Sequence, residues 1–306
     1  MKVSIIMPVH NREAYIQEAI DSILNQTMDD LELIVLDDKS TDHTVEMVKQ
    51  IPDSRIRLVE MPLKTNVPML RNAGIDLAQG DYIGYMDSDD ISEPKRLEWQ
   101  CEFLDNHSEY GIVGGFNRTF GSVESSMVYP TDHDLIVGAL PLRCTLCNGN
   151  ILIRRSIFDA GYRLNPDFFV CEDYDFWVRM IGVTRIANLD KVLLNIRYGA
   201  QQTTTSSWGD PVKLRMRETI LKEIYRTALL NVGLNVTDEE INLYSFHVSD
   251  TVRFHKITSD SVEQFAKLLE KCKEQLNKKH PEYLKGFSEE AARRLRKLNK
   301  RLSSQS

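Results

Sequence analysis

Residues 82–97 read YIGYMDSDDISEPKRL. The stretch opens with an apolar run, Tyr82 to Met86, whose composition is typical of a buried strand. Three aspartates follow at once: Asp87, Asp89 and Asp90. Such carboxylates repel one another, and oxygen ligands of this kind suit hard divalent cations such as Mg²⁺ or Mn²⁺. The alternative is a solvated turn in which Asp90 or Ser92 caps the next helix.

The segments before this stretch alternate between strand-like and helix-like patterns. Apolar, strand-like runs occupy 3–7, 31–38 and 55–61, and helical spacing of apolar residues occupies 12–27, 41–51 and 67–80. This alternation predicts an α/β fold, with a mostly parallel sheet flanked by helices. In such sheets ligands bind beyond the carboxyl ends of the strands.

Polar residues fall at those predicted strand ends. His10, Asn11 and Arg12 follow the first strand, Asp37 and Asp38 end the second, and 87–90 follow the fourth. We therefore expect these segments, although far apart in sequence, to converge on one crevice.

The rest of the chain changes character twice. Between 93 and 197 the pattern is irregular, with strands expected at 111–120, 148–156 and 191–198 and a helix at 172–183 whose apolar face carries Phe176, Trp177, Met180 and Ile181. From about Pro211 onward the sequence is helical, and Thr237 with Glu240 forms a capping-box pattern. We place a boundary near Ser206, between a catalytic domain (1–205) and a helical region (206–306).

Composition is that of a globular protein and excludes little beyond that. The chain has 306 residues, 42% hydrophobic and 27% charged, with a net charge of −7 that gives no indication of nucleic-acid binding. Its 5 cysteines are scattered, which fits a reducing compartment, and we interpret Cys144 and Cys147 as ordinary thiols. The start of the chain lacks a signal-peptide pattern and no apolar run is long enough for a membrane span. We expect a cytoplasmic protein.

Four motifs occur in the order of a known family. They are VSIIMPVHNREAYIQEAIDSILNQT, LELIVLDDKSTDHT, LRNAGIDLAQGDYIGYMDSDDISEPKRL and EDYDFWVRM. Over about two-thirds of its length the chain resembles inverting nucleotide-sugar glycosyltransferases of family two, which have the GT-A fold, and is similar to bacterial enzymes of lipooligosaccharide or capsule assembly. Each motif alone is weak, but their combination is specific.

The resemblance implies roles for residues on the donor side. Those expected to bind the nucleotide-sugar are Pro8, Val9, Asn11, Asp38, Arg71, Asp87 and Ser88. Asp38 would accept from the uracil N–H, and Arg71 would lie near the nucleotide or diphosphate, where a guanidinium suits phosphate oxygens. Asp89 is the expected direct ligand of Mn²⁺ or Mg²⁺, with Asp87 near the ribose and the metal. Asp90 is expected behind these ligands or as a helix cap.

The resemblance also implies a catalytic base. The pair Glu172 and Asp173 corresponds to the acidic pair of the family, in which the aspartate usually takes the proton of the acceptor hydroxyl. Glu172 stays an alternative and Asp175 an outside candidate. Asp173 is also interpretable as a plain helix N-cap, a position that favours the ionised form and weakens a base.

Two departures from the family pattern concern histidines. Gly199 stands where many relatives carry a histidine, and the segment CNGNILIRRS, 147–156, lacks another that precedes this strand in relatives. The polar stretch 201–208 is either a loop that closes over the donor or a linker. There is no glycine-rich loop after the first strand, and no Walker or dinucleotide motif, which favours sugar transfer over sugar activation.

The C-terminal run EEAARRLRKLNKRLSSQS adds a surface question. It carries Arg293, Arg294, Arg296, Lys297, Lys300 and Arg301 with leucines between them. Such a helix either lies on an anionic membrane, which would place the protein peripherally on the inner membrane face, or is simply solvated.

Together these observations predict a metal-dependent inverting glycosyltransferase. It would move a hexose or N-acetylhexosamine from a UDP-sugar to a glycan or lipid-linked glycan hydroxyl in surface polysaccharide or lipooligosaccharide synthesis. One alternative is a nucleotide-sugar-binding partner protein with weak or no activity. A phosphotransfer enzyme with an aspartate nucleophile ranks last, because that chemistry normally places its aspartate after the first strand.

Overall fold

The computed structural model describes residues 1–199 and 210–305, which form two compact units. The sheet unit comprises Met1–Thr131, Leu146–Asp173 and the described part of Thr184–Ala200. The helical unit comprises Asp132–Thr145, Tyr174–Val183 and the described part of Gln201–Ser306. Two short segments that precede the boundary expected near Ser206 thus group with the helical unit.

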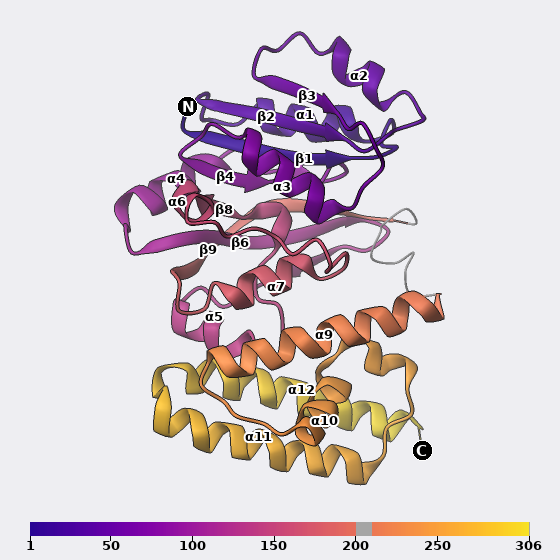
Figure 1. The fold of residues 1–306 in the computed structure, drawn as a ribbon, viewed down its shortest axis with the longest axis vertical. Helices are drawn as coiled ribbons and strands as arrows, with labels where there is room; N and C mark the ends of the chain where they lie inside the picture. The colour runs from indigo at the N-terminus through magenta and orange to yellow at the C-terminus, as the bar shows by residue number, and fades with distance from the viewer. Residues whose placement is uncertain (200–209, 306) are drawn as a thin grey trace. The chain divides into compact units, whose positions relative to one another are not determined.

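The sheet confirms the predicted α/β class, with mixed but mostly parallel strands (Figure 1). Its order is β3-β2-β1-β4-β8-β6-β9-β5, and β7 pairs with β6. The strands are β1 (Val3–Val9), β2 (Leu31–Asp37), β3 (Ile56–Glu60), β4 (Tyr82–Tyr85), β5 (Ile91–Ser92), β6 (Tyr110–Gly121), β7 (Ser125–Met127), β8 (Leu152–Arg154) and β9 (Arg185–Tyr198). β3, β2, β1 and β4 are parallel, so their carboxyl ends share one edge.

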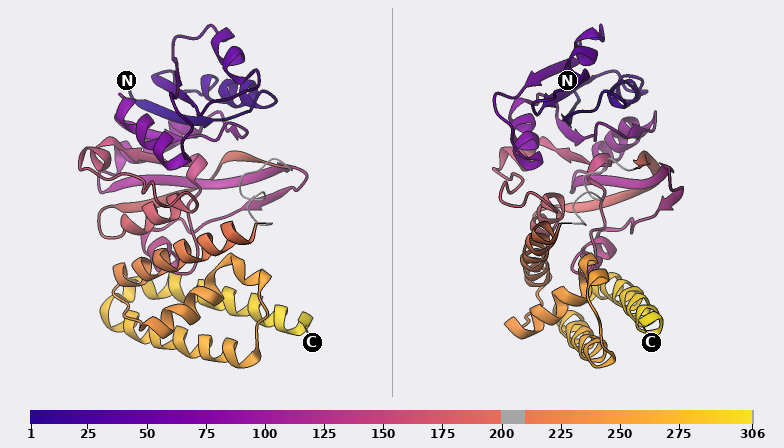
Figure 2. Two further views of the ribbon diagram at one scale, coloured as in Figure 1. Left: turned by 45° about the vertical axis from the view of Figure 1, so that its right-hand side comes forward. Right: turned by 90° about the vertical axis from the view of Figure 1, so that its right-hand side faces the viewer.

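The remaining strands extend that edge. β8 is antiparallel to both β4 and β6, while the long strands β6 and β9 run parallel and side by side (Figure 2). The short β5, which follows Asp90, pairs antiparallel with the end of β9 through Ile91 and Asn195. This pairing fixes the carboxyl end of β9 beside the aspartates that follow β4.

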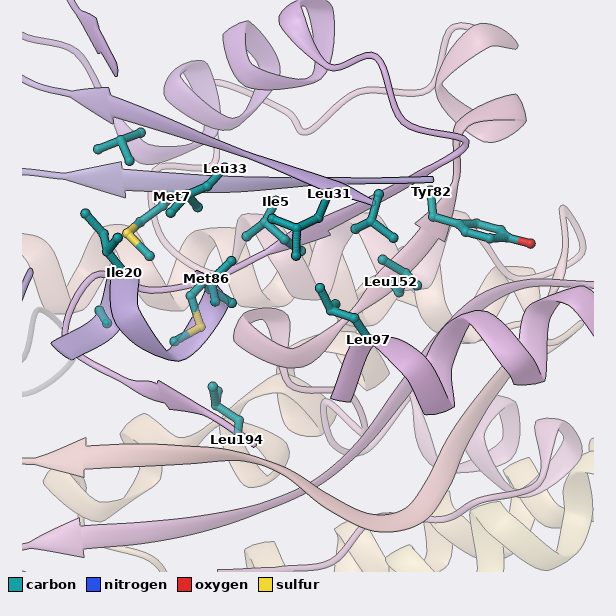
Figure 3. Close-up of a cluster of buried hydrophobic side chains, with 14 of the residues drawn as sticks. Ile5, Met7, Ile20, Leu31, Leu33, Tyr82, Met86, Leu97, Leu152 and Leu194 are labelled. Carbon is teal, nitrogen blue, oxygen red and sulfur yellow. The ribbon is translucent and has the colours of Figure 1, made fainter. Parts of the chain in front are cut away.

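Helices cover both faces of the sheet because the strands are apolar on both faces. They are α1 (Ile16–Leu24), α2 (Thr44–Gln50), α3 (Val67–Leu77), α4 (Arg96–Asn106) and the short α6 (Arg155–Asp159), with a 3-10 turn, η1 (Asn148–Asn150). Ile5 and Met7 join the buried cluster with Ile20 of α1 and Leu97 of α4 (Figure 3). Ile6 points to the other face, where Gly74 of α3 lets the helix lie directly against it.

β1 is longer than the sequence predicted. The apolar run was expected to end at Pro8, but the strand continues to Val9. The backbone carbonyl of Ile6 accepts from Met86, and the register with β4 stops at Ile6. The missing N–H of Pro8 therefore faces a side on which no neighbouring strand needs a donor.

The helical unit confirms the change of character after Pro211. It contains α5 (His133–Ala139), most of α7 (Glu172–Arg179), α9 (Pro211–Asn231), α10 (Asp238–Val248), α11 (Ser259–Lys279), α12 (Leu284–Gln305) and the 3-10 turns η2 (Asp250–Phe254) and η3 (Pro281–Tyr283). Thr237 and Glu240 form the predicted capping box at α10. α5 and α12 approach so closely that a Cβ on Gly286 would lie 2.4 Å from the Leu135 carbonyl oxygen.

Arginines of α12 hold the helical unit together. Arg294 donates to the carbonyl oxygens of His247 (2.5 Å), in the last turn of α10, and Ser249 (2.6 Å), just past it. Arg301 donates to the carbonyl oxygens of Arg253 (2.8 Å) and His255 (2.7 Å). Since Arg293 also pairs with the buried Glu290, three of the six basic residues in the C-terminal run have structural partners. Within the described residues, no helix is both long and apolar enough to cross a bilayer.

Candidate active site

Strained backbone marks the carboxyl edge of the parallel strands. Within 1–199 and 210–305, the non-glycine residues with positive φ are Asn11 (51°), Lys39 (61°) and Cys171 (61°). Asn11 follows β1, Lys39 follows Asp38 after β2, and Cys171 immediately precedes Glu172. Left-handed backbone is unfavourable for such residues and concentrates at functional sites. Each of the three thus adjoins residues expected to bind the donor or catalyse transfer.

Asp38 is a buried carboxylate next to the end of β1. Its backbone N–H donates to the Val9 carbonyl oxygen (2.8 Å), which joins the ends of β2 and β1. Its carboxylate accepts from the Thr65 backbone N–H (2.8 Å) and pairs with Lys64 Nζ (3.1 Å). Asn11, in turn, donates from its backbone to Ser40 Oγ (2.9 Å). Two adjacent strand ends therefore carry residues expected to bind the nucleotide: Pro8, Val9, Asn11 and Asp38.

Arg71 of α3 joins the aspartate cluster to the acidic pair. Its guanidinium is only 6% exposed and contacts Glu172 Oε1 at 2.6 Å and Asp87 Oδ1 at 3.1 Å. With the Asn148 amide oriented to accept, its oxygen lies 2.5 Å and 2.9 Å from the two terminal guanidinium nitrogens. The guanidinium also lies over the ring of the buried Tyr85. Asp87 and Glu172, which lie 16 and 101 positions from Arg71 in the sequence, are thus brought to the same guanidinium.

Glu172 and Asp173 occupy the first turn of α7. The helix begins at Glu172, so Asp173 is inside it rather than at the preceding cap position. Burial raises the pKa of Glu172 to about 7, against the lowering effect of Arg71, and the neighbouring charge of Asp173 raises it further. Glu172 is engaged by Arg71, and Asp173 is the next carboxylate in the same turn of α7.

Asp87 and Asp89 pair with different arginines, Arg71 and Arg12 respectively. Asp89 Oδ2 lies 3.6 Å from Arg12 Nε, and its side chain is 21% exposed. Burial raises the pKa of Asp89, the charge of Asp87 adds to the rise, and Arg12 opposes it. The loop therefore concentrates negative charge that a cation would relieve. Ser88, between the two aspartates, is buried.

Asp90 does not cap a helix, so that one of its two expected roles is wrong. α4 begins at Arg96 after Lys95, whose side chain makes no capping bond. The Asp90 carboxylate instead accepts from the Arg197 backbone N–H at 2.9 Å, at the end of β9. Burial, with the charge of Asp87, raises the pKa of Asp90 to about 8. Its partner is 107 positions away, so the residue ties the loop to β9.

The donor chemistry of the loop fits a hard divalent cation. Among the described residues no group of three or more histidine, cysteine, aspartate or glutamate side chains forms a complete cage. Mg²⁺ and Mn²⁺ in nucleotide sites use one or two carboxylates and take further oxygens from phosphates and water. Asp89 and Asp87, two carboxylates with side chains 21% and 45% exposed, match that requirement. They are the residues that would hold such an ion with a bound diphosphate.

Sequence reasoning missed several residues of this site. Asn148 and Gly149 were taken as part of a strand, yet Asn148 accepts from Arg71 and a Cβ on Gly149 would lie 3.3 Å from Asp87 Oδ2. Arg12 was grouped only with the polar residues after β1, and Arg197 was not singled out. The pattern NGN was the available signal, because small and amide residues favour turns at strand starts.

Other predictions have mixed outcomes. Cys147 is a free thiol, and burial raises its pKa to about 12, which keeps it neutral and supports the interpretation of an ordinary thiol. Gly199 is the last described residue before the gap. The stretch 201–208, proposed as a loop or linker, lies outside the described residues. Asp175 pairs with Arg179 at 2.7 Å within α7, which argues against its candidacy as base.

Comparison with known proteins identifies the family. The model for glycosyl transferase family 2 matches residues 4–161, and the chain belongs to that family. It is thus a glycosyltransferase that uses a nucleotide-sugar, related to bacterial polysaccharide-assembly enzymes as the motifs predicted. This confirms the predicted class of enzyme.

Individual relatives agree with this class. The chain is 29% identical, over 67% of its length and 79% of the other, to the Escherichia coli UDP-Glc:alpha-D-GlcNAc-diphosphoundecaprenol beta-1,3-glucosyltransferase WfgD. Its fold is similar to that of S. aureus TarS 1-349 in complex with UDP-GlcNAc (TM-score 0.65, 19% identity, 95% and 91% of the chains). It is also similar to the mannosyltransferase PcManGT from Pyrobaculum calidifontis with GDP-Man and Mn²⁺ (TM-score 0.58, 15% identity, 96% and 87%).

Proposed function

We propose that this glycosyltransferase uses Mn²⁺ or Mg²⁺ to move a sugar, with inversion, from a UDP-sugar to a hydroxyl of a glycan or lipid-linked glycan. The observation that carries the proposal is the Arg71 bridge, which joins Asp87 of the loop after β4 to Glu172 of α7. Asp89 and Asp173 follow those two residues closely in sequence. A donor-binding carboxylate set and a candidate base are thereby held at one edge of one sheet.

The residues would divide the work as follows. Asp38 accepts from the N–H of the base, and the backbone at Pro8, Val9 and Asn11 supports the nucleotide. Asp89, with Asp87, holds the cation. When bound, the cation neutralises charge that develops on the leaving diphosphate.

On the acceptor side, Asp173 removes the proton of the attacking hydroxyl, and Glu172 stays paired with Arg71. A base on the side opposite the leaving group gives a single displacement and therefore inversion. Arg71 contacts Asp87 and Glu172 at once. The spacing between the aspartate loop and the first turn of α7, which carries Asp173, is therefore set before either substrate arrives.

The relatives support the finer assignment of donor and setting. WfgD is named for a UDP-glucose donor and a lipid diphosphate acceptor, and TarS binds UDP-GlcNAc. PcManGT, in contrast, binds GDP-Man. The preference of this enzyme for uracil over guanine is therefore tested by comparing the affinities of UDP and GDP in the presence of Mn²⁺. We expect UDP to bind more tightly and Asp38→Ala to remove most of the difference.

The test of catalysis uses a panel of UDP-sugars with Mn²⁺ and follows release of UDP. Asp89→Ala should abolish Mn²⁺-dependent binding of UDP. Asp173→Asn should keep UDP binding and lower turnover by about 10²–10⁴-fold, the usual contribution of a general base. Asp29→Asn is the matched control, because Asp29 is an exposed aspartate that precedes β2, away from the carboxyl edge.

Two results would reject the proposal. Binding of UDP without turnover of any UDP-sugar would favour the nucleotide-sugar-binding partner protein. Loss of UDP binding in Asp173→Asn, equal to the loss of turnover, would remove Asp173 from the role of base.

A further inference from the structure

Arg197 lies at the point where β9 ends beside the loop after β4. Its backbone N–H donates to Asp90 Oδ1 (2.9 Å), and its side-chain Nε donates to the carbonyl oxygen of Asp89 (3.0 Å). One residue therefore bonds to both aspartates that end the DSDD sequence. The short pairing of β5 with β9 continues these contacts on the next residues.

The side chain of Arg197 is itself fixed in place. Its guanidinium lies 4.8 Å from the ring centre of Tyr15 and 4.5 Å from that of Phe120. It forms an ion pair with Glu18 of α1, and it is 23% exposed. A planar guanidinium held by two ring faces and a carboxylate keeps one orientation.

Asp89 is consequently held from two directions. Arg197 bonds its backbone carbonyl, while Arg12 lies 3.6 Å from its carboxylate. The contact with Arg12 is long and polar, of the kind that a divalent cation would replace. Arg197 bonds the backbone carbonyl of Asp89. This bond can therefore persist whether or not the Asp89 carboxylate binds a cation.

We propose that Arg197 is a positioning residue: by fixing the Asp89 backbone it orients the Asp89 carboxylate that would hold the cation. The inference rests on the proposed function in one respect, the use of a cation by Asp89. Groups that orient a metal ligand usually change metal affinity by about 10–100-fold when removed. A residue that only stabilised the fold would change the melting temperature and leave metal affinity intact.

The experiment compares Arg197→Met with Arg185→Met. Arg185 begins the same strand and also lies over a ring, 5.2 Å from the centre of Tyr110, far along β9 from the loop. Binding of UDP is measured by calorimetry with and without Mn²⁺, and hydrogen exchange of residues 86–94 is measured in the free protein.

For Arg197→Met we expect faster exchange in 86–94 and Mn²⁺-dependent UDP binding weaker by about 10–100-fold. Binding of UDP without Mn²⁺ should be unchanged, and Arg185→Met should match the unsubstituted protein in all three measurements. Arg197→Lys should recover part of the affinity, because an ammonium can reach one acceptor but cannot stack as a planar fork. Glu18→Gln should have a smaller effect than Arg197→Met.

Two outcomes would overturn the inference: unchanged exchange in 86–94, or faster exchange with unchanged Mn²⁺-dependent affinity. If the unsubstituted protein binds UDP equally with and without Mn²⁺, the proposed function fails in its use of a cation. The exchange measurement then still decides whether Arg197 fixes the loop, and turnover of Arg197→Met against Arg185→Met decides whether that matters for catalysis.

Discussion

Arginines in the two units bind different kinds of partner. In the sheet unit Arg71 contacts two carboxylates from separate segments, Asp87 and Glu172. In the helical unit Arg294 and Arg301 donate to backbone carbonyl oxygens at the end of α10 and after it. The first pattern gathers charge at a sheet edge, and the second satisfies backbone groups that a helix end leaves open. A run of basic residues in sequence is therefore not by itself evidence for a site, because its side chains can serve the packing of their own unit.

The largest expected effect breaks the charge network of the sheet unit. Arg71→Met leaves Glu172, whose side chain is 12% exposed, without its cation. Removing one partner of a buried pair typically costs about 3–5 kcal/mol, so we expect that loss in urea unfolding, together with loss of turnover. The double variant Arg71→Met, Glu172→Gln should regain part of the stability.

The control for this prediction is Arg57→Met. Arg57 is an exposed arginine of the same unit whose side chain donates to the Leu77 carbonyl oxygen at 3.3 Å. Its substitution should change stability by less than about 0.5 kcal/mol. Equal effects of Arg71→Met and Arg57→Met would contradict the role given to the bridge.

The helical unit should show its own pH dependence, through His247. The side chain is fully buried, its ring stacks on Phe265, and burial lowers its pKa from 6.5 to about 4. The unfolded chain therefore binds the proton more readily than the folded one between these values. Stability is complete above about pH 6.5 and falls as pH drops toward 4, by about 3 kcal/mol in all.

His247→Phe should remove this part of the pH dependence, as measured by urea unfolding at pH 7, 5.5 and 4.5. His43→Phe serves as control, because that residue lies in the sheet unit at the start of α2 and is exposed. A slope that persists in His247→Phe would assign the dependence to other groups.

A smaller effect is expected where α5 and α12 pack. Gly286→Ala places a methyl group 2.4 Å from the Leu135 carbonyl oxygen, and overpacking of this kind costs about 1–3 kcal/mol. Binding of UDP at 25 °C should be unchanged, because the donor residues belong to the sheet unit. Glu289→Ala, on the exposed side of α12, is the matched control, and thermal unfolding gives the readout.

The smallest effect concerns the basic surface of α12. Arg293, Arg294 and Arg301 have structural partners, and the exposed basic side chains of the run are Arg296, Lys297 and Lys300. We expect no sedimentation with vesicles that contain anionic lipid, and no change of stability beyond about 0.5 kcal/mol in Arg296→Gln, Lys300→Gln. Cosedimentation that this double variant abolishes would restore the membrane-surface interpretation.

Local patterns predicted most of the sheet unit. The alternation of apolar runs gave the parallel strands, and the rule about their carboxyl ends brought Asp38 and the DSDD loop to one edge. Pairings between distant segments were not predictable, because nothing near Arg71 in sequence indicates that its partner is 101 residues away. The role of Asp90 depends on the pairing of β5 with β9, and a single sequence does not reveal such a long-range register.

The helical unit shows the complementary difficulty. Its capping box and helix periodicity were readable, but the grouping of 132–145 and 174–183 with the helical unit does not follow from a single boundary near Ser206. Phe176, Trp177 and Met180 looked like the apolar face of a helix, which they are. Sequence alone does not say which core such a face enters.

The interleaved path of the chain has a consequence for synthesis. Residues 132–145 and 174–183 leave the ribosome well before α9 to α12, with which they form one unit. Trp177 and Phe176, which are buried in the finished protein, therefore leave the ribosome before the segments that complete their unit. A chaperone that binds apolar segments of nascent chains, or the release of chains stalled near residue 205, would act before the unit is complete.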